Sequence, residues 1–198
     1  IARSMLADRP VGMAVGTYLG GLPGTPWWRV QARSGGQVVE QATHVVDLQR
    51  YLVGEIETVQ AVAATRLMTD VENLDVADVS VASLVFDTGA IGTLLNSSGL
   101  NGVPQEPWDH GLTLVARDLS FRVWTDGGRI AAAGETRELV NPEDCKYLLD
   151  EAFVKAVATG DSSHIRSTYS DAVLTLRATL AINESARTGE LVRVADLG

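Results

Sequence analysis

Residues 26–55 read PWWRVQARSGGQVVEQATHVVDLQRYLVGE, and this stretch predicts both the central helix of the fold and the functional site. Apolar side chains recur through its second half with the 3.6-residue period of an amphipathic helix, over residues 41–53. Gly54 is suited to end that helix. We expect one stripe of the helix to face a core, and its members are Ala42, Val45, Val46, Gln49, Leu52 and Val53.

The opposite stripe begins with Glu40 and His44, which are four residues apart. On a helix that opens near Glu40, this spacing places both side chains on one face, one turn apart. A carboxylate beside an imidazole can raise the imidazole pKa and fix its tautomer, which prepares a proton shuttle near neutral pH. The alternative is structural: Glu40 complements the helix dipole, and His44 is a hydrogen-bonding residue of the scaffold.

Two tryptophans and two arginines precede the helix. Adjacent aromatic residues such as Trp27 and Trp28 are by default anchors of a core or an interface. Their position in a Gly/Pro loop, followed by Arg29 and Arg33, also fits the wall of a ligand pocket. Gly35-Gly36 is interpreted as a turn, because the GxGxxG spacing of a dinucleotide-binding loop is missing.

The composition excludes several classes of protein. A chain of 198 residues can form one domain, residues 1–198, with a sizeable core. Its net charge of −9 argues against nucleic acid as a partner. No apolar run reaches the roughly 18 residues of a membrane span. The single cysteine, Cys145, rules out an internal disulfide framework, and a cytoplasmic location fits.

We find no metal-ligand spacing and no serine nucleophile motif. The first residues show neither an initiator Met nor a secretory signal, so we expect a piece of a longer protein.

The remaining pattern predicts strands in the middle and helices at the ends. Residues 1–9 are interpreted as the end of a helix, and residues 101–111, with His110, as a loop. Strands are expected at 11–20, 57–68, 76–86, 90–100, 112–118, 119–125, 129–134 and 191–194. This distribution indicates an α+β fold, in which a mainly antiparallel sheet has helices on one face and the other face is free for a partner.

Two further helices are predicted near the C-terminus. The first has Asn141 as N-cap, Pro142 at N1 and Gly160 at its end, and Cys145 lies on its apolar face, which we expect to be buried. The second is capped by Ser167 and ends at Gly189. Its expected core-facing residues are Ala172, Val173, Leu176 and Leu180.

Taken together, these motifs resemble the C-terminal domain of the Gfo/Idh/MocA oxidoreductases. The family order W-R, S-G-G, [D/E]-x-x-x-H-x-x-D and Y-L-x-G is matched in sequence by Trp28-Arg29, Ser34-Gly35-Gly36, Glu40 with His44 and Asp47, and Tyr51-Leu52 with Gly54. The likeness continues through Asp78 to Gly92, Phe153 to Gly160, Tyr169 to Ala172 and Ser185 to Gly189, so it spans nearly the whole chain.

The resemblance implies a fold and a chemistry. The fold is the glucose-fructose oxidoreductase type: an open, mainly antiparallel sheet with helices on one face and an exposed face that often forms homo-oligomers. The chemistry is hydride transfer between NAD or NADP and a sugar, inositol or related polyol. By this likeness His44 handles the proton of the substrate hydroxyl, and Glu40 binds substrate or orients His44. Arg29, Trp28 and Tyr18 are candidates for the pocket wall.

This chain also departs from the family pattern. Glu40 replaces the commoner aspartate and is one methylene longer. The family binds its dinucleotide on an N-terminal Rossmann domain with a GxGxxG turn and an E-K-P lysine, and neither motif is present here. We therefore expect residues 1–198 alone to bind no NAD tightly and to catalyse nothing. Two alternatives stay open: a non-catalytic binding or oligomerisation module that kept the fold, and a free-standing ligand-binding module.

Overall fold

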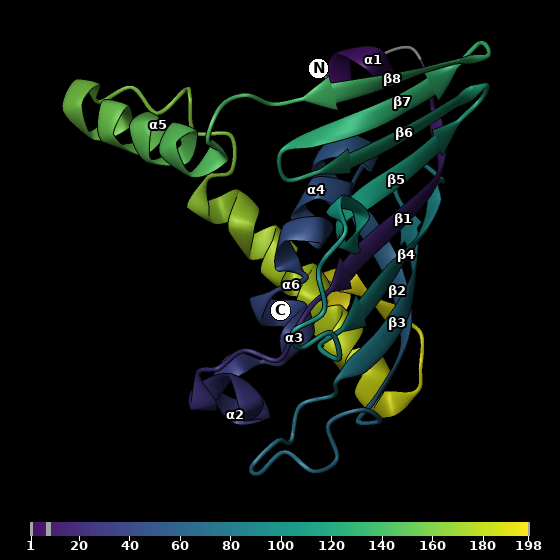
Figure 1. Cartoon of the computed structure of the whole chain (residues 1–198), viewed down its shortest axis with the longest axis vertical. Coiled ribbons are helices and arrows are strands. Elements are labelled where there is room, and N and C mark those ends of the chain that lie inside the picture. Colours follow the sequence, from purple (N-terminus) through teal and green to yellow (C-terminus); the bar gives the residue numbers. More distant parts are fainter. Residues whose placement is uncertain (1, 7–8, 198) are drawn as a thin grey trace.

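The computed structural model describes residues 2–6 and 9–197, and its main feature is an open sheet (Figure 1). The described residues form nine strands. They are β1 (Val11–Leu19), β2 (Ile56–Ala64), β3 (Val79–Phe86), β4 (Ile91–Ser97), β5 (His110–Ala116), β6 (Leu119–Trp124), β7 (Gly127–Ala132), β8 (Glu135–Val140) and β9 (Val192–Arg193).

The strand order in the sheet is β8-β7-β6-β5-β1-β4-β3-β2-β9. Strands β1 and β4 pair in parallel, and every other neighbouring pair in this order is antiparallel. A parallel pair needs a long connection, which the helices and the β2–β3 hairpin between β1 and β4 provide. The predicted α+β class with a mainly antiparallel sheet is therefore confirmed.

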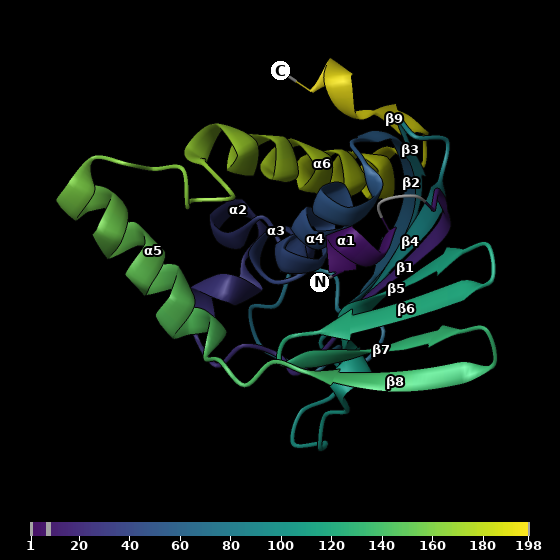
Figure 2. The ribbon, with the colours of Figure 1, turned by 90° about the horizontal axis from the view of Figure 1, so that it is seen from above.

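The helices of the described chain lie on one side of this sheet (Figure 2). They are α1 (Ala2–Leu6), α2 (Gln31–Ser34), α3 (Gln37–Glu40), α4 (Thr43–Val53), α5 (Cys145–Thr159) and α6 (Tyr169–Thr188), with 3-10 turns at η1 (Pro26–Arg29), η2 (Pro107–Asp109) and η3 (Val194–Asp196). Helices α4 and α6 cover the sheet and close the core, whose largest fully buried apolar side chains include Phe86, Leu84, Leu94, Leu112, Leu114 and Ile182.

Helix α4 packs on β1 through the stripe that its sequence predicts. Ala42, Val45, Val46, Gln49 and Val53 are buried and Leu52 is half-buried. The helix can approach β1 closely because Gly16 has no side chain: a Cβ there would lie 2.7 Å from Cγ1 of Val45. This contact fixes the direction in which the exposed face of α4 points.

Helix α6 buries a different face from the predicted one. Ala172, Val173, Leu176 and Leu180 are all exposed, so the prediction that they face the core is wrong. Apart from Ile182, the buried side is made of small residues, which are Thr175, Ala178, Thr179, Ala181 and Ser185. Their size lets the helix lie close to β2, where Ser185 Oγ accepts a hydrogen bond from the Ala61 N–H and donates one to the Glu190 carbonyl. The N-cap is Thr168 rather than Ser167, whose hydroxyl bonds to Asp171 instead.

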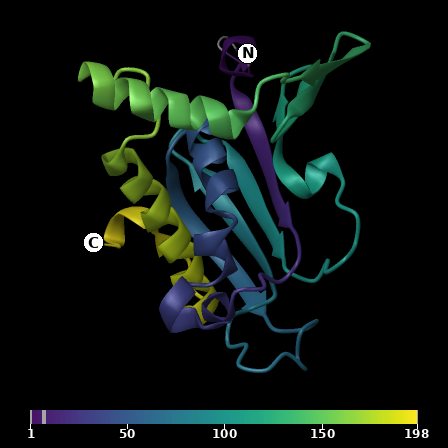
Figure 3. The same ribbon diagram turned by 60° about the vertical axis from the view of Figure 1, so that its left-hand side comes forward.

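Helix α5 projects away from the rest of the fold (Figures 1 and 3). It begins at Cys145, because the carboxylate of Asp144 accepts hydrogen bonds from the N–H groups of Lys146 and Tyr147; the predicted cap at Asn141 is wrong. No residue of α5 is buried among the described residues, and Cys145 is exposed where a core position was expected. The predicted end at Gly160 is confirmed.

Several strand boundaries also differ from the prediction, and one strand was not predicted. Strand β2 ends at Ala64 instead of residue 68, because the next N–H groups turn towards the carboxylate of Asp78: those of Arg66, Leu67 and Met68, at 2.8, 2.7 and 2.6 Å. His110 opens β5 rather than lying in a loop. Strand β8 was not predicted, since its charged sequence ETRELV is that of an exposed edge strand.

Candidate functional site

A cleft of about 430 Å³ lies along the exposed side of α4. His44 lies in the first turn of α4, is exposed, and lines this cleft. At the other end of the cleft, the guanidinium of Arg3 lies 5.1 Å from the centroid of the Tyr51 ring, and Arg166 donates to the Tyr51 hydroxyl. The remaining lining residues are Asp47, Leu48, Arg50, Glu55, Ser167 and Asp171.

Glu40 lies outside this cleft. It ends the separate short helix α3, and the backbone breaks at Gln41, with φ −121° and ψ −55°, before α4 begins at Thr43. The prediction of one continuous helical face carrying Glu40 and His44 is therefore wrong. No hydrogen bond or ion pair joins these two side chains in the described part of the chain.

Glu40 instead lines a second, much smaller recess together with Trp28. The recess has a volume of about 10 Å³ and lies between α3, η1 and the ends of the sheet strands. Its other lining residues are Leu22, Pro23, Gly36, Gln37, Gln41, Val76 and Ser98. The structure thus brings Glu40 and Trp28 together and places His44 in a neighbouring hollow.

The two remaining predicted wall residues, Tyr18 and Arg29, line neither hollow. Tyr18 lies at the end of β1 and stacks on His110, with ring centroids 4.1 Å apart. Burial raises the pKa of the Tyr18 phenol. Arg29 belongs to η1, and its Nε is buried without a hydrogen-bond partner among the described residues.

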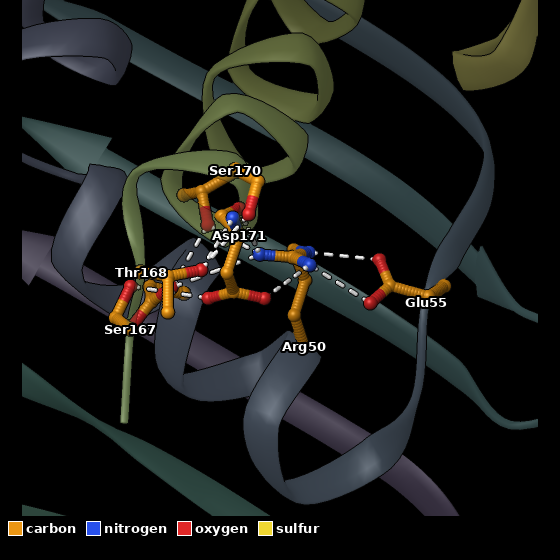
Figure 4. A network of polar contacts seen from close by, with 8 residues as sticks. Arg50, Glu55, Ser167, Thr168, Ser170 and Asp171 are labelled. Carbon is orange, nitrogen blue, oxygen red and sulfur yellow. Dashed lines mark hydrogen bonds and ion pairs between the residues drawn. The ribbon is translucent and has the colours of Figure 1, made fainter. Parts of the chain in front are cut away.

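Sequence reasoning missed the polar network that holds α4 in place, which is centred on Arg50 (Figure 4). The Arg50 guanidinium donates to both oxygens of Glu55 at 2.8 Å, to Asp171 Oδ1 at 3.1 Å and to Thr175 Oγ1 at 2.6 Å. Thr175 in turn donates to Asp47, one turn along α4 from His44. The sequence did carry a signal for this network, because Arg50 lies between Val46 and Val53 on the side of the helix that was predicted to be buried.

The electrostatics of this network keep Arg50 charged. Burial alone would lower the pKa of Arg50, but the hydrogen bonds and charges of Glu55 and Asp171 outweigh it, and its pKa is raised. The carboxylates come from the α4–β2 connection and from the first turn of α6. The network therefore joins three elements and fixes the helix that presents His44 to the cleft.

Within residues 2–6 and 9–197, no group of three or more His, Cys, Asp or Glu side chains is arranged to hold a metal ion. None of the helices described is both long and apolar enough to cross a membrane.

Comparison with known structures supports the fold. A levoglucosan dehydrogenase in complex with NADH superposes with a TM-score of 0.80 at 24% sequence identity; the match covers 98% of this chain and 62% of that one. An oxidoreductase from Thermotoga maritima gives 0.75 at 17% identity, covering 97% and 58%. The WlbA dehydrogenase from Bordetella pertussis, in complex with NADH and UDP-GlcNAcA, gives 0.71 at 22% identity, covering 97% and 57%. This chain thus spans about three fifths of the length of these structures.

Comparison with families of known sequence gives the assignment. No curated protein sequence matches the chain. The model of the GFO/IDH/MocA C-terminal domain matches residues 10–131, which is more than half of the chain and includes β1, the α2–α4 segment and the strands up to β7. Because the sequence match and the fold agree, the chain belongs to the GFO/IDH/MocA C-terminal domain family.

Proposed function

We propose that this chain is the substrate domain of an NAD- or NADP-dependent oxidoreductase that transfers hydride between the nicotinamide and a sugar, inositol or related polyol. The observation that carries the proposal is the position of His44, exposed to the cleft on a helix that the Arg50 network holds in place. Membership of the family and the folds of NADH-bound sugar dehydrogenases support it.

In this proposal the residues of the chain handle the substrate rather than the dinucleotide. When bound, NAD or NADP supplies the nicotinamide that accepts the hydride from the carbinol carbon of the substrate. His44 accepts the proton of the reacting hydroxyl, together with a lysine of a preceding domain. Glu40 and Trp28, which share the small recess, contact a distal part of the substrate. Arg29 and Tyr18 line neither hollow, so this proposal gives them no contact with the substrate.

The dinucleotide itself is assigned to a preceding Rossmann domain. The exposed apolar side chains of α5, which include Phe153 and Val157, support a further domain that covers them. In this proposal residues 1–198 form a single domain without catalytic activity of their own, and the whole enzyme is cytoplasmic.

The direct test is the variant His44→Ala in the full-length protein. We expect turnover on the best polyol substrate to fall about 10²–10³-fold, the usual effect of removing a general acid/base. His164→Ala is the matched control, because His164 is exposed and lines neither hollow. Undiminished turnover in the His44 variant would show that the imidazole has no part in proton transfer.

The second candidate is a non-catalytic binding or oligomerisation module that kept the family fold. The observation that favours it is a row of exposed apolar residues on the sheet face away from the helices. Cross-strand pairing puts Val85 beside Ile91, Ile91 beside Met13, and Met13 beside Val115, on β3, β4, β1 and β5. A full-length protein that binds no NADH and oxidises no polyol would favour this candidate.

The same row supports a homo-oligomer formed through the sheet face, whichever candidate holds. A self-complementary apolar surface on a β-sheet suits an isologous dimer. We expect Val85→Lys to shift the molar mass measured by light scattering towards the monomer, because it places a charge in the interface. Val140→Lys, at a more exposed valine at the end of β8 outside the row, should leave the mass unchanged. An unchanged mass in both variants would exclude this face.

A further inference from the structure

Two glutamines that line the small recess beside Glu40 have side-chain polar atoms that the fold leaves without partners. Gln37 is only 8% exposed, yet neither its Nε2 nor its Oε1 has a hydrogen-bond partner in the described part of the chain. Oε1 of Gln41, which lines the same recess, is also buried and unpaired. Buried amides are nearly always hydrogen-bonded, so such a cluster requires an explanation.

The backbone carbonyls around Gln37 do not supply that explanation, because they are already engaged. The Gln37 carbonyl accepts from the N–H groups of Gln41 and Ala42, at 2.9 and 3.0 Å. The preceding turn is held as well, since the Gly35 carbonyl accepts from Asn183 Nδ2 of α6 at 2.6 Å. The backbone that carries the Gln37 side chain is therefore fixed, as the support of a binding group needs to be.

We propose that this recess is a subsite for one hydroxyl group of the sugar or polyol substrate, and that Gln37 is its specificity-determining residue. Gln37 and Glu40 are three residues apart on α3, so their side chains lie on the same face of that helix. The inference rests on the proposed function, because it places a distal hydroxyl here while the reacting hydroxyl meets His44.

The size and chemistry of the recess select a hydroxyl. Its volume of about 10 Å³ accommodates one oxygen-sized group. An amide offers both a donor and an acceptor, and a hydroxyl both accepts and donates. The carboxylate of Glu40 disfavours an anion, and a single carboxylate without other charged ligands does not make a cation site.

The kinetic test uses the full-length protein, its best polyol substrate and the set of monodeoxy analogues of that substrate. We expect the wild-type protein to discriminate against one analogue by about 10–100-fold in kcat/KM, the effect of leaving a buried polar group unpaired. Gln37→Leu should abolish this discrimination by lowering kcat/KM on the parent substrate only. Discrimination that persists in Gln37→Leu would overturn the proposal.

The matched control is Gln49→Leu, the same substitution at a buried glutamine that packs on β1 and lines neither hollow. This variant should keep the discrimination. Melting temperatures show whether each variant is folded, and Gln37→Glu, which preserves size but replaces the donor, substitutes for Gln37→Leu if the latter unfolds. Gln37→Glu should also weaken the discrimination, and an unaltered ratio would again contradict the subsite.

A structural test separates this inference from the proposed function. A crystal structure of the full-length protein with levoglucosan as the probe should show a sugar oxygen within hydrogen-bond distance of the Gln37 amide. An ordered water in the recess with the sugar elsewhere, or no sugar oxygen there at all, would overturn the subsite. If no polyol is oxidised, the proposed function fails, but the position of the sugar still decides whether the recess binds a hydroxyl.

Discussion

At the scale of single residues, the stacked pair of Tyr18 and His110 joins β1 to β5 at the end of the sheet nearest the site. Burial lowers the pKa of His110, and this effect outweighs the opposing influence of Asp109 and of the Leu19 carbonyl. The imidazole is therefore kept neutral in the folded chain. Its Nε2 is buried, so protonation would place a charge there whose loss of hydration Asp109 and the Leu19 carbonyl offset only in part.

This arrangement predicts an acid-sensitive fold. The unfolded chain takes up a proton on His110 near its ordinary pKa of about 6.5, before the folded chain does, so stability is complete above that pH and declines below it. We expect the free energy of unfolding in urea to fall between about pH 7 and pH 5, and His110→Gln to fall less steeply. His164→Gln, at an exposed position, should keep the wild-type slope. Equal slopes for all three proteins would rule out His110 as the titrating group.

Residue identity could be predicted from the sequence better than residue placement. The spacing of Glu40 and His44 indicates a shared helical face, but the backbone break at Gln41 and Ala42 directs the two side chains into different hollows. Gln37 carries no motif of its own, and its unpaired burial becomes visible only when α3 is packed against η1 and the sheet ends. Whether the residues of the site act as proposed stays a prediction.

At the scale of elements, hydrophobic periodicity predicts the buried face of α4 correctly and the buried face of α6 wrongly. Helix α4 lies against the sheet along its apolar stripe, so the pattern and the packing agree. Helix α6 turns threonine, alanine and serine inward, because close approach to β2 requires small residues and because their hydroxyls pair with backbone groups. Its larger apolar residues are left exposed, and a pattern based on hydrophobicity alone selects the wrong face.

The Arg50 network is the contact that fixes α4 relative to α6 and β2. Lysine cannot reproduce its forked geometry, because a single ammonium replaces two parallel hydrogen bonds to Glu55 and the bonds to Asp171 and Thr175. We expect Arg50→Lys to lower the free energy of unfolding by about 1.5–3 kcal/mol, the usual cost of hydrogen bonds to charged groups. Chemical denaturation measures this directly.

The exposed pair of Arg129 and Glu138 provides the control for that experiment. Both side chains are 52% exposed, so Arg129→Lys should change stability by less than about 1 kcal/mol. If the two lysine variants lose the same amount, the buried network adds nothing beyond an ordinary surface ion pair.

At the scale of the whole molecule, the sequence predicts the strands and the helix layer but not the strand order. Hairpins such as β3–β4 follow from the local turn at residues 87–89. The parallel pairing of β1 with β4 brings together residues about 80 positions apart, since Met13 pairs with Ile91, and no local pattern reports it. The edge strand β8 was not predicted for a related reason: its charged sequence lacks the alternation of apolar and polar residues that indicates a strand.

Helix α5 carries apolar residues that are not buried against any other part of the described chain. Phe153 is 61% exposed and Val157 is 72% exposed, although their spacing is that of a buried stripe. If a preceding domain covers this face, replacing both residues with glutamine should leave the melting temperature of residues 1–198 nearly unchanged. The same double variant should destabilise the full-length protein by about 1–3 kcal/mol, since apolar area is then lost from an interface.

The effect of the substitutions is compared between residues 1–198 and the full-length protein. Val140→Gln, at a position that is 80% exposed on an edge strand, controls for the loss of an exposed apolar side chain and should affect neither protein. Melting curves of all six proteins suffice. A similar loss in both backgrounds would mean that α5 packs on its own chain in solution, and no effect in either would mean that the preceding domain leaves this face uncovered. Only a loss confined to the full-length protein fits a face built to receive another domain, because only there does the substitution remove buried area.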